Sequence, residues 1–190
     1  MYHDGDFDLA GFAVGAMERG AELPAGVAAG DVLLGLASGG LQTNGYSLAR
    51  QVLEGRYAEA MPDGRTVGDH LLDEHRSFLP AVAPLLDAGL VRGAAHVTGG
   101  GLPGNLPRAL PDGLGAVVDG AWPEPPIVTR IREVGGVDED EMRRVFNLGV
   151  GFVVAVAPED VERADALCPE PLLRIGRVVR GEADPLAPHD

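Results

Sequence analysis

The segment Thr98-Gly99-Gly100-Gly101-Leu102-Pro103-Gly104-Asn105 restricts the possible fold of this chain more than any other stretch of its sequence. It follows a short apolar run, residues 94–97, which reads as a buried strand. Consecutive glycines permit positive φ angles and let the backbone approach another group closely. Proline is favoured at the first position of a helix, where its missing N–H costs nothing. We therefore predict a strand, a tight turn and a brief helix that starts at Pro103.

Such a turn is also a candidate anion site. Backbone N–H groups at the start of a helix lack intrahelical partners and attract phosphate or carboxylate groups. Thr98 adds a hydroxyl group, and Asn105 lies in the first helical turn. Thr98, Gly99, Gly100, Gly101 and Asn105 are thus predicted phosphate-binding residues. The alternative is a glycine-rich turn that serves packing alone.

The same glycines also match the dinucleotide fingerprint. The pattern is Gly99-x-Gly101-x-x-Gly104, and Asp119 ends the next apolar run at about the expected separation. Pro107 and Pro111, however, limit the helix to about two turns, which is short for a Rossmann crossover. We keep dinucleotide binding as the less favoured alternative.

Composition excludes several functional classes. The net charge of −14 argues against nucleic acid or an anionic membrane surface as a partner. All 15 basic residues are arginine, so chemistry that requires a lysine is excluded. No apolar run is long enough to span a membrane, and the single Cys168 excludes an internal disulfide, which fits a cytoplasmic protein. Cys168 has no histidine near it in sequence, so we expect it to be a packing residue.

The histidines do not predict a metal site. His70 and His75 are spaced too far apart to share a helical face, and His96 is expected to lie in the core. Asp4, Asp6 and Asp8 could attract Mg²⁺, but an acidic, solvated start of the chain explains them equally. We assign no metal ligand in this chain.

Hydrophobic periodicity predicts strands that alternate with helices. The expected strands are residues 9–18, 31–36, 94–97, 114–118, 149–156 and 173–179, and the expected helices are 46–53, 67–72, 78–86, 126–134, 139–145 and 158–167. This order predicts an α/β (α+β) fold in which a mixed sheet, with some antiparallel pairing, is flanked by helices.

Two further loops carry polar residues next to glycines. Thr43, Asn44 and Gly45 lie between an expected strand and an expected helix, and their side chains could orient a substrate. Asn147 precedes the strongest expected strand and could reach a ligand there. An ordinary turn at Asn44-Gly45 and a tight entry to the strand at Asn147 are the alternative interpretations.

Taken together, the motifs resemble a known family. The matching segments are Gly5-Asp6-Phe7-Asp8-Leu9-Ala10-Gly11-Phe12-Ala13-Val14-Gly15, Gly35-Leu36-Ala37-Ser38 with Thr43-Asn44-Gly45-Tyr46-Ser47-Leu48, His96-Val97-Thr98-Gly99-Gly100-Gly101-Leu102 with Asn105-Leu106-Pro107-Arg108, and Glu141-Met142 with Phe146-Asn147-Leu148-Gly149-Val150-Gly151. In this order they closely resemble aminoimidazole ribonucleotide synthetase, the phosphoribosylformylglycinamidine cyclo-ligase of purine biosynthesis.

The resemblance covers only the C-terminal part of that family. It implies that residues 1–181 are a C-terminal domain, that residues 182–190 are a disordered tail, and that the N-terminal domain with most of the ATP and Mg²⁺ site is absent from this chain. The family forms homodimers, so a homo-oligomer is implied. In the family, ATP phosphorylates the amide oxygen of formylglycinamidine ribonucleotide, and a nitrogen then attacks the activated carbon and releases phosphate.

By the same resemblance, Thr98, Gly99, Gly100 and Gly101 bind phosphate, while Thr43, Asn44, Gly45 and Asn147 lie near the substrate. No catalytic residue is assigned.

The chain departs from the family pattern at five positions. Gln42-Thr43 stands where a His-Ser pair is expected, Gly39 replaces a serine, and Phe78 and Pro80 replace a tyrosine and a lysine. Glutamine cannot act as an acid or base at neutral pH. These departures leave open a second hypothesis, a non-catalytic phosphate-ligand binding or assembly module.

Overall fold

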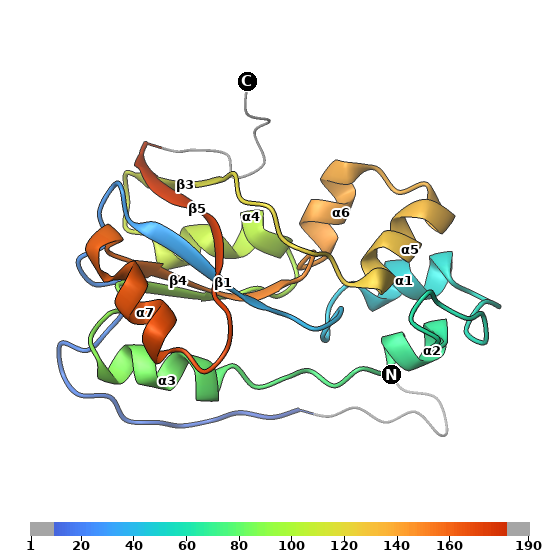
Figure 1. The fold of residues 1–190 in the computed structure, drawn as a ribbon, viewed down its shortest axis with the longest axis horizontal. Helices are drawn as coiled ribbons and strands as arrows, with labels where there is room; N and C mark the ends of the chain where they lie inside the picture. Colours follow the sequence, from blue (N-terminus) through green and yellow to red (C-terminus); the bar gives the residue numbers. More distant parts are fainter. Residues whose placement is uncertain (1–9, 182–190) are drawn as a thin grey trace.

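The computed structural model describes residues 10–181, which build a five-stranded sheet with helices around it (Figure 1). The strands are β1 (Val32–Ala37), β2 (Gly93–His96), β3 (Leu114–Val118), β4 (Val150–Val156) and β5 (Leu173–Arg180). Their order in the sheet is β2-β4-β1-β5-β3, and each described pair is antiparallel.

The helices are α1 (Tyr46–Val52), α2 (Val67–Leu71), α3 (Leu79–Asp87), α4 (Gly101–Asn105), α5 (Pro126–Gly135), α6 (Glu139–Val145) and α7 (Val161–Leu167). Short 3-10 turns follow α4 at Leu106–Ala109 and precede α7 at Pro158–Asp160. Within residues 10–181, no helix has the length and apolar character needed to cross a membrane.

The central strands are buried on both faces, which explains why β4 is an uninterrupted apolar run. Successive side chains of a strand point to opposite faces. Accordingly, Leu34 and Val154 belong to one core cluster, while Leu33 and Val153 belong to another on the other face. Helices α3 and α7 cover the first face, and α4 covers the second (Figure 1).

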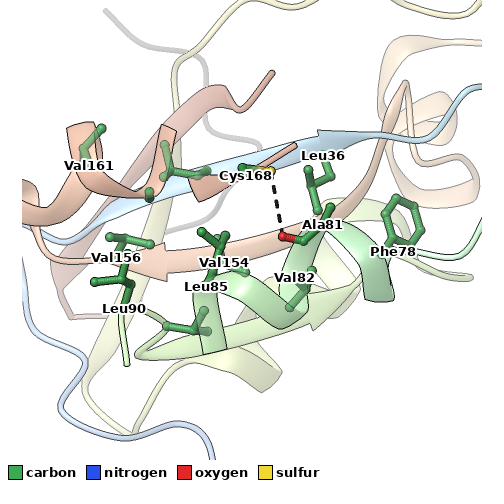
Figure 2. Packing of buried hydrophobic residues seen from close by; sticks show 13 residues of the cluster. Leu36, Phe78, Ala81, Val82, Leu85, Leu90, Val154, Val156, Val161 and Cys168 are labelled. Atoms are coloured by element: carbon green, nitrogen blue, oxygen red, sulfur yellow. Dashed lines mark hydrogen bonds between the residues drawn. The ribbon is translucent and has the colours of Figure 1, made fainter. Parts of the chain in front are cut away.

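Cys168 is part of the first cluster (Figure 2). Its Sγ lies 3.8 Å from the carbonyl oxygen of Ala81, and burial raises the pKa of the thiol. A buried thiol with a raised pKa is a poor nucleophile. The expectation of a packing role is confirmed.

A third core cluster lies at one end of the sheet, where α1, α2, α5 and α6 pack together (Figure 1). Its members come from these helices and from the loops that connect them to the sheet: Leu41, Ala49, Leu53, Met61, Val67, Leu71, Ile127, Val128, Ile131, Met142, Phe146 and Leu148. The helical group therefore holds the loops at this end of the sheet in place.

The predicted class, an α/β (α+β) fold with helices flanking a sheet, is confirmed. The expected mixed pairing is antiparallel in all described pairs. The expected helix start at Pro103 is wrong by two residues, because α4 begins at Gly101. Pro103 still lies in the first turn, where its lack of an N–H leaves no helical bond unmade.

The strand expected over residues 9–18 is also wrong for its described part. Residues 10–18 form no strand, and the side chains of Phe12 and Val14 are 96% and 90% exposed. A segment of alternating apolar residues forms a strand only where another strand pairs with it, and none of the described strands is hydrogen-bonded to this segment. Asp4, Asp6, Asp8 and the expected tail at residues 182–190 lie outside the described residues.

Candidate functional site

The topology of the sheet brings the three predicted loops together at one end of its strands. Strands β1 and β2 flank β4 and run antiparallel to it, so both end where β4 begins. Ala37 at the end of β1 pairs with Val150, and His96 at the end of β2 pairs with Phe152. The loop at 38–45, the glycine turn at 98–101 and the loop at 146–149 therefore adjoin one another.

Asn147 ties the third loop to the first. Its Nδ2 donates to the carbonyl oxygens of Gly40 and Leu41, at 3.0 and 3.2 Å. Its Oδ1 accepts from the Ser38 hydroxyl at 3.0 Å and from the Gly149 N–H at 2.8 Å. The residue is buried, with only 3% of its surface exposed, so its hydrogen-bonding capacity is used in joining the two loops.

Asn105 has a similar function within the glycine turn. Its Nδ2 donates to the carbonyl oxygen of Gly101 at 2.7 Å, and its Oδ1 accepts from the Thr98 hydroxyl at 3.1 Å. The Gly101 N–H donates to the Thr98 carbonyl oxygen at 3.1 Å and closes the turn. Asn105 is buried, and its hydrogen bonds stabilise the conformation of the turn.

Two glycines are required by the close packing of the loops. A Cβ on Gly101 would lie 2.0 Å from the carbonyl oxygen of Arg143, and one on Gly45 would lie 2.3 Å from the ring of Phe146. Both residues also have positive φ angles, 59° and 80°. Close packing therefore requires glycine at both positions, and it leaves the open side of the loops available to a ligand.

The open side is formed by Thr43, Asn44, Gly99 and Gly100, which are exposed or half-buried. The Oδ1 atom of Asn44 lies 3.6 Å from the position of a Cβ on Gly99, so the first loop and the glycine turn lie against each other. Among residues 10–181, no acceptor meets the N–H groups of Gly99 and Gly100. Two N–H donors of exposed residues, without an acceptor in this part of the chain and beside polar side chains, can receive an anionic oxygen.

His75 was not among the site residues predicted from the sequence. The fold brings it to this end of the strands from the connection between α2 and α3. Its Nδ1 lies 3.0 Å from the Thr43 hydroxyl, and its Nε2 lies 3.2 Å from the Nε2 of His96. The expectation that His96 lies in the core is wrong, because its side chain is on the exposed side of the end of β2. Only the folded chain places these residues together, so no local pattern could have shown it.

Of the five departures from the family pattern, Thr43 lies on the open side of the loops, and the other four occupy different environments. Phe78 is buried and its ring contacts those of His96 and Phe152, whereas Pro80 is exposed at the start of α3 and Gly39 is exposed in the first loop. Gln42 is 3% exposed, has a φ of 60°, and its amide oxygen and nitrogen have no hydrogen-bond partner.

The dinucleotide alternative is wrong. A Rossmann unit requires two parallel strands joined by a crossover helix. Here β2, which carries the glycine turn, and β3, which precedes Asp119, lie at opposite edges of an antiparallel sheet. Asp119 forms an ion pair with Arg177 instead.

A cavity of about 250 Å³ opens beside α4 and is lined by residues of α4, α6 and the segment that precedes α5. Trp122, Phe146 and Leu148 form its apolar wall. Its two carboxylates, Glu124 and Glu139, are each paired with Arg132. In the described part of the chain, no group of three or more His, Cys, Asp or Glu residues is arranged to hold a metal ion.

Comparison with known proteins agrees with this geometry. The family model described as "AIR synthase related protein, C-terminal domain" matches residues 28–185. Two relatives are named phosphoribosylformylglycinamidine cyclo-ligase. One, from Sorangium cellulosum (strain So ce56), is 51% identical over 173 residues, which cover 86% of this chain and 50% of the relative. The other, from Myxococcus xanthus (strain DK1622), is 45% identical, over 98% of this chain and 57% of the relative.

A solved structure, the thiamine-monophosphate kinase from Stenotrophomonas maltophilia K279a, shares the fold with a TM-score of 0.52 and 19% identity, over 86% of this chain and 53% of that chain. The chain spans about half the length of the curated relatives it matches. The family match covers most of the chain, and the three loops that carry the resemblance lie together at one end of the strands. The chain therefore belongs to the AIR synthase related protein, C-terminal domain, family.

Proposed function

We propose that this chain is the substrate- and phosphate-binding half of an ATP-dependent phosphoribosylformylglycinamidine cyclo-ligase, which converts formylglycinamidine ribonucleotide to aminoimidazole ribonucleotide. The names of relatives at 51% and 45% identity support this assignment. The single structural observation that carries it is the pair of N–H groups at Gly99 and Gly100, which have no acceptor among residues 10–181 and belong to exposed residues beside Asn44.

In this proposal, the exposed groups contact the ligand and the buried asparagines shape the site. Gly99 and Gly100 receive a phosphate group beside Thr98, and the buried Gly101, whose N–H donates to the Thr98 carbonyl oxygen, closes the turn that holds it. Thr43, Asn44 and Gly45 lie along the rest of the substrate. Because α4 has only five residues, the anion site rests on the N–H groups of the turn and not on a helix dipole.

Asn105 and Asn147 act indirectly in the same proposal. Asn105 fixes the carbonyl groups of the turn, and Asn147 joins the loop at 38–45 to the start of β4. Substituting either residue is expected to weaken binding by displacing a loop.

ATP and Mg²⁺ are proposed to bind mainly to an N-terminal half, which the relatives' greater length accommodates. The two halves then form the active site between them, and a homo-oligomer is part of the same proposal. Catalysis that needs groups from both halves is lost when they are separated, because positioning supplies much of the rate enhancement.

Calorimetry with formylglycinamidine ribonucleotide tests the assignment, with and without an added N-terminal half. Gly99→Ala is the informative variant, because its Cβ meets only Asn44 Oδ1 at an ordinary 3.6 Å and yet narrows the anion site. We expect it to weaken binding about tenfold, or about 1.4 kcal/mol. Gly104→Ala is the matched control, because Gly104 is also exposed and the nearest atom to its Cβ lies 4.0 Å away. Absence of binding by the wild-type chain, both alone and with the N-terminal half, contradicts the proposal.

The second candidate is a non-catalytic phosphate-ligand binding or assembly module. The buried, unpartnered Gln42 and the exposed Pro80 favour it, because neither can supply an acid, a base or a cation. It predicts binding of phosphate ligands without ring closure in the presence of the N-terminal half.

A further inference from the structure

His75 and His96 face each other beside the loop at 38–45 and the glycine turn. Their rings meet edge to face, with centroids 5.2 Å apart at an angle of 64°, and their Nε2 atoms are 3.2 Å apart. His96 ends β2 two residues before Thr98, and His75 contacts Thr43 in the first loop. The pair thus connects two loops of the site.

The geometry limits how many protons the pair can carry. A hydrogen bond between two ring nitrogens requires one N–H and one lone pair, so both imidazoles cannot be charged while it persists. The Thr43 hydroxyl, 3.0 Å from His75 Nδ1, can donate or accept. The chain Thr43–His75–His96 therefore accommodates either direction of donation, and a proton taken up at one end can be released at the other.

The surroundings of the pair carry little compensating charge. The rings of Phe78 and Phe152 flank His96 at 5.9 and 6.2 Å and are uncharged. The next residue, Arg76, forms an ion pair with Glu170 and lies over the Phe78 ring. Within residues 10–181, no salt bridge joins His75 or His96 to a carboxylate; the other charged neighbour in sequence, Glu74, is exposed. Partial burial, together with the charge of His75, lowers the pKa of His96.

We propose that Thr43, His75 and His96 form a proton relay that serves as the acid–base group of the candidate site, with His75 as the positioning residue that links the other two. The relay rests on the proposed function. In ring closure, the attacking nitrogen forms the C–N bond, the C–O bond to the phosphorylated oxygen breaks, and phosphate leaves with that bond's electrons. The proton lost by the nitrogen passes to the neutral relay and then to solvent.

The relay also supplies an acid–base group, which Gln42 cannot provide at neutral pH. The chain has no imidazole at position 42, and the amide there is buried without a partner. The hydrogen bonds of His75 and His96 join these rings to each other and to Thr43 and do not include Gln42, so the relay is independent of position 42.

The first test follows the imidazole resonances of this 190-residue chain by NMR between pH 5 and 8. Interacting groups titrate in separate steps that belong to the pair. We expect a higher pKa of His96 in His75→Gln than in the wild type, because the charge of His75 no longer lowers it. His70, which is bonded to Asp63, lies outside the pair, and its resonances serve as the internal control for the fold of the variant. A His96 pKa that is the same in His75→Gln and the wild type overturns the relay.

The second test measures ring closure against pH with the N-terminal half added. His75→Gln is expected to lower kcat about 100-fold and to remove the acidic limb of the kcat profile, with little change in KM. Thr43→Ser keeps the hydroxyl and should retain most of the rate, whereas Thr43→Val should not. An unchanged profile in His75→Gln overturns the relay, whereas absence of ring closure by the wild type overturns the proposed function and leaves the NMR titration to decide the relay.

Discussion

Gly101 shows how little space separates the glycine turn from the end of α6. Gly101→Ala places a methyl group 2.0 Å from the Arg143 carbonyl oxygen and forces a positive φ on alanine. We expect a loss of about 3 kcal/mol in the free energy of unfolding, measured by urea denaturation. Gly104→Ala, in the same short helix with no close contact, should be neutral or stabilise the chain by about 0.5 kcal/mol. Equal stability of the two variants would contradict the packing described for the turn.

Gln42 is unfavourable in the folded state for two reasons. Its φ of 60° is uncommon for a residue other than glycine, and its buried amide makes no hydrogen bond. Gln42→Met keeps a similar volume and removes the polar atoms, so it should raise the free energy of unfolding by about 1 kcal/mol. Gln51→Met, on the exposed side of α1, is the control and should change stability by less than about 0.5 kcal/mol. A destabilised Gln42→Met would show that the amide has a partner in solution.

At the scale of elements, sequence patterns predicted the positions of individual helices and strands, because these depend on interactions between residues close in sequence. The apolar runs at β1, β3, β4 and β5 and the helices α1, α5 and α6 form where periodicity indicated. The antiparallel order of the sheet was not predictable, because strand partners are set by the packing of segments far apart in sequence. The same limit applies to the site. The glycines and asparagines could be read from motifs, but the contact of His75 with His96 joins residues 21 positions apart across a helix.

The exposed segment at residues 10–18 gives a prediction at this scale. Because Phe12 and Val14 are almost fully exposed, replacing both with serine should leave the free energy of unfolding unchanged within about 0.5 kcal/mol. Val154→Ala, which removes two methyl groups from the buried face of β4, should cost about 2 kcal/mol. A comparable loss in the double serine variant would mean that the segment packs against the domain.

At the scale of the whole molecule, titrating groups predict how stability varies with pH. The pKa of His96 is lowered by burial and by His75, so the unfolded chain binds this proton more readily. Stability should therefore decrease as pH falls through about 6.5, and His96→Gln should remove that step.

A second decrease should follow at lower pH. The hydrogen bond from Arg130 lowers the pKa of Glu59, and the backbone N–H of Thr66 lowers that of Asp69. Their contribution is present above the ordinary carboxyl pKa and is lost as pH falls below about 4. Thermal unfolding between pH 3 and 8 measures both steps, and a His96→Gln variant that retains the upper step contradicts the assignment to His96.

The central claim is that three loops of this chain form one wall of an active site whose other wall belongs to a separate half. A single-turnover assay with formylglycinamidine ribonucleotide and ATP tests it most directly. We predict no ring closure by this chain alone and ring closure when the N-terminal half is added. Ring closure by this chain alone, or none by the two halves together, would contradict the account.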